Sequence, residues 1–118
     1  MNRLKIRTKK AAVPLSQLLP TNQLVLVDFR VSYTYENGER TDKPNGVSYT
    51  IADMLTFNRF DVFVPVTTPV VTEEKLKEAE SSENRIFVTL TNAIAKPIQA
   101  GYGEIEFSVS ADSIEIVS

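Results

Sequence analysis

The amino-acid sequence predicts a mainly β protein with one short helix. Apolar and polar residues alternate in several runs rich in β-branched and aromatic residues, and a period of two is typical of half-buried strands. Helical spacing is confined to one stretch, VTEEKLKEAESSENR. A chain of 118 residues is long enough to form one domain with a core that needs neither a metal nor disulfides.

The first predicted strand is the longest alternating run, LVLVDFRVSYTYE, at residues 24–36. A strand of this length is well above the average, so it is expected to bend or to serve two sheets. Its odd positions are apolar or aromatic, which predicts a buried face made of Val25, Val27, Phe29, Val31, Tyr33 and Tyr35.

Two more strands are predicted before the helix, at residues 47–52 and 60–66. Pro65 has no backbone N–H, so the third strand is expected to lie at a sheet edge or to end near this residue. The residues expected to face the core are Val47, Tyr49, Ile51, Phe60, Val62, Val64 and Val66.

The helix is predicted to begin after Thr72, a suitable N-cap, and to end near Ser82 after two to three turns. A fourth strand is predicted at residues 85–91 and a fifth at 104–109, with a loop at 92–103 between them. A short extended piece is expected to follow at residues 113–117, with Ile114 and Ile116.

The predicted order β-β-β-α-β-β, with the helix between strands three and four, is that of an OB-fold, a five-stranded Greek-key barrel. Residues 21–118 are assigned to this barrel and residues 1–20 to a basic N-terminal arm, which is either separate from the domain or part of it. One feature departs from the pattern, because the first strand shows no glycine or bulge midway along its length. The alternative is an open β-sandwich crossed by one helix.

A polar segment separates the first two strands. Asn37-Gly38 would suffice for a tight hairpin turn, since both residues accept positive φ angles, yet a second pair follows at Asn45-Gly46. The segment 37–46 is therefore interpreted as a loop that reaches beyond the barrel, with an Asn-Gly turn at each end. In OB-folds this loop and the one between strands four and five flank the oligonucleotide-binding face. They carry the candidate residues Arg40, Lys43, Lys96 and Tyr102.

Several kinds of chemistry are excluded because the chain contains no His and no Cys. It has no Ser-His-Asp triad, no thiolate nucleophile and no Cys/His zinc site. Glu36, Glu39 and Asp42 would bind Ca²⁺ or Mg²⁺ only weakly and do not have EF-hand spacing, so solvated loop charge is the preferred interpretation. Glu104 and Glu106 alternate with apolar residues and are read as an exposed strand face. We therefore predict a protein that is not an enzyme and has no cofactor or metal.

The net charge of −2 conceals an asymmetry. The first ten residues hold five basic residues and no acidic one, whereas the rest of the chain holds 8 basic and 15 acidic residues. A basic arm on an acidic body indicates contact with a phosphate backbone or another anionic surface. The other interpretation is a first strand whose charged face is solvated. The absence of Cys and of a long apolar run favours a cytoplasmic location without membrane contact.

A binding face is suggested by residues that break the apolar register. Phe63 falls on the polar side of the third strand, opposite Phe60, Val62 and Val64, and an outward Phe is a candidate for base stacking, a packing contact or a dimer surface. Phe87 breaks register in the same way on the fourth strand. The segment TFNRF adds Phe57 and Arg59, and Arg30 is expected on the outer face of the first strand.

Three segments, DFRVSYTYENGER, TLTNAIAKPI and FSVSADSIEIV, resemble small uncharacterised proteins encoded by conjugative plasmids and integrative conjugative elements of Gram-positive bacteria. Some of those proteins are similar to OB-fold single-stranded-DNA-binding proteins. The resemblance covers residues 24–117 and rests on general texture rather than on an invariant motif. It implies a cytoplasmic accessory protein for plasmid or conjugative DNA processing, and it assigns no binding residues.

The first functional hypothesis is a non-enzymatic single-stranded-DNA-binding domain, in which cations grip phosphates and aromatic rings stack on bases. The second is a protein–protein adaptor or structural subunit that self-associates through a sheet edge. A third is small-ligand or carbohydrate binding in the barrel mouth, which OB-folds also support.

Overall fold

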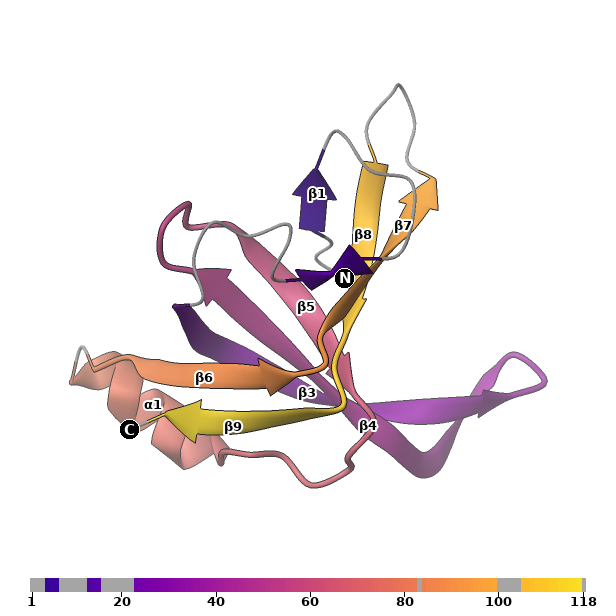
Figure 1. Cartoon of the computed structure of the whole chain (residues 1–118). Helices are drawn as coiled ribbons and strands as arrows, with labels where there is room; N and C mark the ends of the chain where they lie inside the picture. Colours follow the sequence, from indigo (N-terminus) through magenta and orange to yellow (C-terminus); the bar gives the residue numbers. More distant parts are fainter. Residues whose placement is uncertain (1–3, 7–12, 16–22, 83, 100–104, 118) are drawn as a thin grey trace.

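The structure is a computed structural model that describes residues 4–6, 13–15, 23–82, 84–99 and 105–117 (Figure 1). The prediction of a mainly β protein with one short helix is confirmed. The elements are β1 (Leu4–Ile6), β2 (Val13–Pro14), β3 (Leu24–Glu36), β4 (Glu39–Asp53), β5 (Arg59–Val64), α1 (Glu73–Ser81), β6 (Ile86–Thr91), β7 (Ile94–Gln99), β8 (Ile105–Ser110) and β9 (Ser113–Val117).

The helix is where the sequence places it. Its N-cap is Thr72, whose side chain accepts a hydrogen bond from the backbone N–H of Lys75 at 3.2 Å. Leu76 and Ala79 pack against the core from one face of α1. No helix in the described part of the chain is long and apolar enough to span a membrane.

The five-strand count is wrong, because the described residues form nine strands in one curled, mixed sheet. Four strands make up the excess: β9 is the short extended piece expected at residues 113–117, and the other three lie in the predicted loop and the predicted arm. The predicted loop 92–103 contains β7, which pairs with β8 along its whole length. The predicted arm contains β1 and β2, which pair with β8 and β7.

The sheet curls at two corners that lie side by side. Asn92 and Ala93 separate β6 from β7, and Ala111 and Asp112 separate β8 from β9. The Asn92 side-chain amide donates to a carboxylate oxygen of Asp112 at 2.9 Å, and the Asp112 backbone N–H donates to the Thr91 carbonyl at the same distance. At these corners the chain passes from the β6–β9 pair to the β7–β8 pair, which lies in another part of the curled sheet.

The strands β3, β4 and β5 form an antiparallel meander, and the rest of the sheet joins it at both ends. The start of β3 pairs with β6 through Leu24–Leu26, and β5 pairs with β8 in parallel. Pro65 follows the last residue of β5, which agrees with the expectation that the strand ends there. An edge position for this strand is wrong, since β5 lies between β4 and β8.

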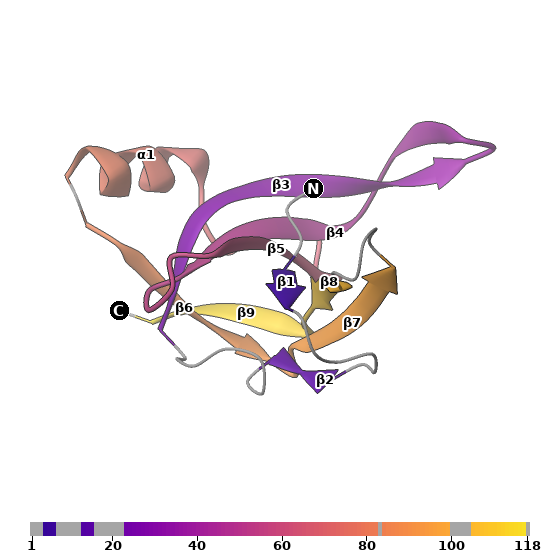
Figure 2. The ribbon, with the colours of Figure 1, turned by 90° about the horizontal axis from the view of Figure 1, so that it is seen from above.

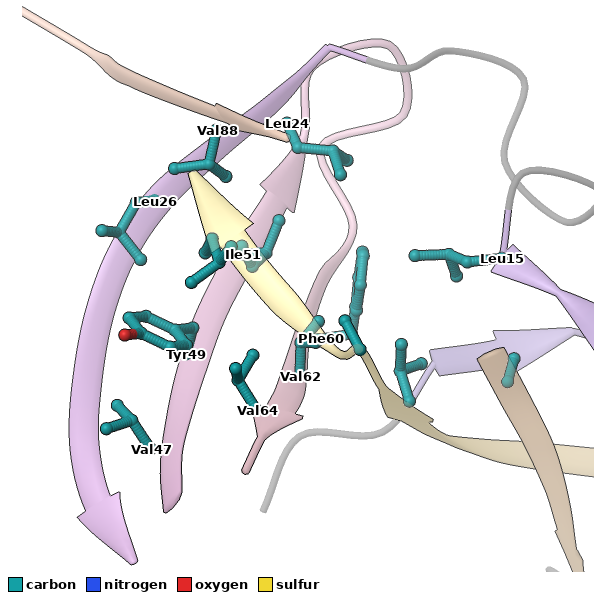
Figure 3. Close-up of a cluster of buried hydrophobic side chains, with 14 of the residues drawn as sticks. Leu15, Leu24, Leu26, Val47, Tyr49, Ile51, Phe60, Val62, Val64 and Val88 are labelled. Carbon is teal, nitrogen blue, oxygen red and sulfur yellow. The ribbon is translucent and has the colours of Figure 1, made fainter. Parts of the chain in front are cut away.

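The core lies inside the curl, and Figure 3 shows its side chains pointing inward from the meander. The inward faces predicted for the second and third strands are confirmed, except that Val66 lies beyond β5 and is 47% exposed. Alternating apolar residues of the fourth and fifth predicted strands, among them Val88 and Phe107, are buried as well. The most completely buried side chains of this core include Val47, Tyr49, Ile51, Phe60, Val62, Val64, Val88 and Phe107.

The first strand differs from the prediction because it contains a bulge. Leu26 pairs with Ile51 and Asp28 with Thr50, so Val27 is an extra residue on β3. One extra residue exchanges the two faces of a strand. Before the bulge Leu24 and Leu26 face the core, and after it Phe29 and Val31 pack against the core. The sequence prediction that this strand has no bulge is therefore wrong, as is the inward position of Val27, whereas Val25 is buried as predicted although it lies on the opposite face from Leu24 and Leu26.

Beyond the core, β3 and β4 continue as a two-stranded ribbon, residues 32–36 and 39–46, that projects from the sheet (Figure 2). Asn37 and Gly38 form its turn, with φ angles of 53° and 80°. The second predicted turn does not exist, because Asn45 and Gly46 lie within β4. The segment 37–46 is thus the turn of a hairpin followed by one of its arms, and it is not a loop.

Burial of Tyr49 predicts that the fold is less stable at alkaline pH. Burial raises the pKa of its hydroxyl above 10.0, although the Val70 N–H, which donates to the hydroxyl oxygen at 2.9 Å, opposes the rise. Above about pH 10 the unfolded chain therefore loses this proton before the folded chain does, and the free energy of unfolding falls as pH rises. Urea unfolding at pH 8 and at about pH 11 should show this loss in the native protein, and Tyr49→Phe should make it smaller. An identical loss in both proteins would assign the sensitivity to other groups.

Candidate nucleic-acid interface

The outer face of the meander carries a row of side chains that crosses four strands. Arg30 of β3 is the register partner of Ser48 of β4, Ser48 is the partner of Phe63 of β5, and Phe63 is the partner of Ser110 of β8. The residues on either side of Ser48 and Phe63 face the core, so this row, hereafter the outer row, faces away from it. Arg30 is exposed and Phe63 is partly exposed.

The Phe63 ring packs against Gly46, which has no side chain. A Cβ atom added to Gly46 would lie 2.6 and 2.8 Å from ring carbons of Phe63, and also against the Val64 carbonyl oxygen. The ring is therefore seated on the backbone of β4. Its register partners Ser48 and Ser110 are small, so they leave the ring partly exposed. The outward Phe63 predicted from the sequence has both a packing role and an accessible surface.

Arg59 and Phe57 lie at the other end of β5, close to the turn from β4. The side chain of Asp53, which is fully buried, accepts hydrogen bonds from the Leu55 N–H at 3.1 Å and from the Thr56 hydroxyl at 2.6 Å. This turn holds Phe57 at a φ of 60° with 70% of its surface exposed. Leu55 is 60% exposed beside it.

The ribbon carries an arginine stacked on a tyrosine. The Arg40 guanidinium carbon lies 4.2 Å from the centroid of the Tyr33 ring, a cation–π contact. Tyr35 is the register partner of Arg40 and is 66% exposed. The prediction that Tyr35 is a core residue is wrong, because the ribbon extends past the core. Alternation alone does not reveal where a core ends.

Hydrogen bonds between two threonines fix the shape of the ribbon. The hydroxyls of Thr34 and Thr41 are bonded to each other, and Thr41 also donates to the Thr34 carbonyl at 2.9 Å. The Lys43 backbone N–H donates to the Thr41 hydroxyl at 3.3 Å. These bonds stabilise the irregular pairing between Tyr33 and Tyr35, where β4 has extra residues. Lys43 is exposed at this irregularity.

Lys96, a further candidate, belongs neither to the outer row nor to the ribbon. Lys96 is exposed on β7, where its register partner is Ser108, and it lies on a strand rather than on the predicted loop. Tyr102 lies outside the described residues, as do four of the five basic residues at the N-terminus, Arg3, Arg7, Lys9 and Lys10.

Charges on the candidate surface are mixed. Asp61, next to the outer row on β5, accepts a hydrogen bond from the Thr50 hydroxyl at 2.8 Å. The ribbon carries Glu36, Glu39 and Asp42 together with Arg40 and Lys43. Within the described ranges, no three carboxylates or other potential ligands gather closely enough to hold a metal ion.

The structure brings Arg30 and Phe63 together in one row and places Arg40 and Lys43 together on the ribbon. It adds Tyr33, Tyr35, Gly46 and Ser48, which sequence reasoning missed. In comparisons with known proteins, no family model, curated protein or solved structure matches this chain. The relation to proteins of conjugative elements therefore stays a prediction from sequence.

Proposed function

We propose that the protein binds single-stranded DNA without catalysis, through the outer row and the ribbon. The setting that the sequence resemblance implies is plasmid or conjugative DNA processing. The observation that carries the proposal is the outer row, which sets a cation and an aromatic ring on one line across the sheet. Neighbouring strands are about 4.8 Å apart, so the backbones of Arg30 and Phe63 are about 10 Å apart.

The strand pairing supports an OB-type barrel. If β6 with β7 and β8 with β9 are taken as two strands bent at their corners, the order becomes β3, β4, β5, the bent β8/β9, the bent β7/β6 and β3 again. The pairing then runs around the curled sheet and returns to β3, as in an OB-type barrel, although the separate strands outnumber the five of that fold. The ribbon is then the hairpin between the first two strands, beside the face on which OB-folds bind oligonucleotides.

The ribbon supplies the second part of the proposed site. A guanidinium that already rests on a tyrosine ring loses less conformational freedom on binding than a free arginine side chain. Tyr35 offers a second, exposed ring on the same ribbon. Single-strand binders combine such rings with cations that follow the backbone.

The number of candidate cations predicts a modest dependence of DNA affinity on salt concentration. The candidate cations in the described residues are Arg30, Arg40, Lys43, Arg59 and Lys96. Each phosphate contact to a single strand contributes about −0.7 to the slope of log K against log salt, so the slope from these five should not be steeper than about −3.5. A steeper slope would require basic residues outside this set, such as those at the N-terminus or Lys75, Lys77 and Arg85.

The test is a fluorescence-anisotropy titration of labelled single-stranded oligothymidylate, with duplex of equal length as comparison, at several salt concentrations. Phe63→Leu keeps an apolar side chain over Gly46 but removes the flat ring, so it should weaken binding by about tenfold. Arg30→Gln and Arg40→Gln should weaken binding and flatten the salt slope, whereas Lys75→Gln on the helix is the matched control. Absence of binding at low salt would refute the proposal.

An adaptor role is favoured by a separate observation. Leu55 and Phe57 expose apolar surface together on a turn that the Asp53 side chain holds in place. Exposed apolar surface of this kind is typical of protein-binding sites. In the same titration, Phe57→Ser should leave DNA affinity unchanged if this turn serves a protein partner. A tenfold loss would instead make Phe57 part of the DNA site.

A further inference from the structure

The bulged strand β3 has an open edge. It pairs with β6 only through Leu24–Leu26, whereas its pairing with β4 continues to Glu36. From Asp28 onward, no strand in the described part of the chain pairs with the second edge of β3. An edge of this kind presents backbone N–H and C=O groups that can pair with another strand.

A hydrogen bond shows which groups lie on this edge. The Phe29 N–H donates to its neighbour's side chain, the Oδ1 atom of Asp28, at 2.8 Å. It therefore does not donate to β4. The N–H and C=O of one residue in an antiparallel strand point to the same side, and the next residue points to the other side. Phe29 and Val31 thus face the open edge, and the Asp28 carboxylate takes the place of a strand acceptor.

The sequence along this edge is complementary to itself. If two copies pair antiparallel around a twofold axis at Phe29, each Phe29 lies opposite the other, and Asp28 of one copy lies opposite Arg30 of the other. Both charged side chains are exposed on the same face, so two ion pairs form. An axis at Arg30 would place like charges together, and an axis at Val31 would place Arg30 opposite Ser32.

We propose that the protein forms a homodimer through this edge, in the register that pairs Asp28 with Arg30 of a second copy. On pairing, the Phe29 N–H exchanges the Asp28 carboxylate for the Phe29 carbonyl of the second copy, and the carboxylate turns to the guanidinium. The paired stretch is short, which places the interface among weak, transient ones. Arg30 belongs both to this interface and to the outer row, so the pairing is tested without DNA. The pairing joins two outer faces into one continuous sheet.

The opposing interpretation is that Asp28 protects the edge from pairing, as charged residues on edge strands do. The two interpretations predict opposite effects of Asp28→Asn. Loss of the carboxylate weakens a dimer held by Asp28–Arg30 pairs. It strengthens association if the carboxylate is a guard, because the edge then lacks the charge that discourages pairing.

Sedimentation equilibrium of the full chain without DNA, from about 10 to 500 µM, tests the proposal. The native protein should show a monomer–dimer equilibrium. Asp28→Arg and Arg30→Asp should each weaken it at least tenfold, and the double exchange Asp28→Arg with Arg30→Asp should restore it. Glu115→Arg, an exposed carboxylate on β9, is the control and should have no effect.

Three results would overturn the proposal. They are a strict monomer at the highest concentration, a double exchange no better than the single ones, and stronger association of Asp28→Asn. Far-UV circular dichroism checks that each variant is folded. If Asp28→Arg fails to fold, Asp28→Asn and Arg30→Asp still decide between the two interpretations.

Discussion

Replacement of Phe60 by alanine is expected to cost about 3–5 kcal/mol of the free energy of unfolding. Phe60 is fully buried on β5, with Ile51 of β4 as its register partner. Its removal takes apolar surface out of the core and leaves a cavity that neighbouring strands cannot fill, since their positions are fixed by pairing on both sides of β5. A domain of this size has a total of about 5–15 kcal/mol, so the variant should be close to unfolded at 37 °C.

The matched control is Phe57→Ala, which removes the same atoms three residues earlier. Phe57 is 70% exposed, so the loss should be within about 0.5 kcal/mol. Urea unfolding followed by circular dichroism measures both variants. Equal losses for the two substitutions would mean that Phe57 packs against the protein in solution and is not a free surface residue.

Gly46→Ala is expected to cost about 3 kcal/mol, a large effect for one methyl group. The new Cβ would collide with the Val64 carbonyl oxygen and with the Phe63 ring. The ring can rotate away, whereas the carbonyl belongs to the paired backbone of β5 and cannot move without disturbing the sheet. The substitution should also weaken DNA binding, because it displaces the Phe63 ring from its position against β4.

Two comparisons identify the cause of that loss. Gly38→Ala should cost only about 1 kcal/mol, since it has a φ of 80° but no atom within 4 Å of the added Cβ. In the double variant Gly46→Ala with Phe63→Ala, the costs should be less than additive, because removal of the ring relieves one of the two collisions. Full additivity would show that the carbonyl alone is responsible.

The fold could be predicted for strands in which the alternation of apolar and polar residues matches the buried and exposed faces. Strands β4, β5 and β6 alternate without interruption, so their inward residues were predicted correctly. The strand β3 was half wrong because Leu24, Val25, Leu26 and Val27 are all apolar, and a run without polar residues hides the point at which a bulge exchanges the faces. The pairing of β7 was missed because Pro97 and two glycines suggested a loop.

The candidate site was predicted only where it depends on local pattern. Phe63 breaks the alternation of its own strand and Arg30 follows the polar positions of the first strand, and both are visible in the sequence. The second Asn-Gly pair was misread because Gly46 is required by the Val64 carbonyl and the Phe63 ring, both on the next strand. Tyr35 continues the apolar register of β3, and only the extent of the neighbouring strands shows that the ribbon has left the core.

The parallel contact between β5 and β8 sets an order of assembly. The meander β3–β4–β5 joins neighbours along the chain, so it can form early, while the chain is still being synthesised. The contact of Val62 with Val109 has to wait until residue 109 has left the ribosome. Until then the edge of β5 that faces β8 is unpaired, and the apolar side chains of Phe60, Val62 and Val64 are only partly covered. The nascent meander is therefore the species most exposed to aggregation and to chaperones.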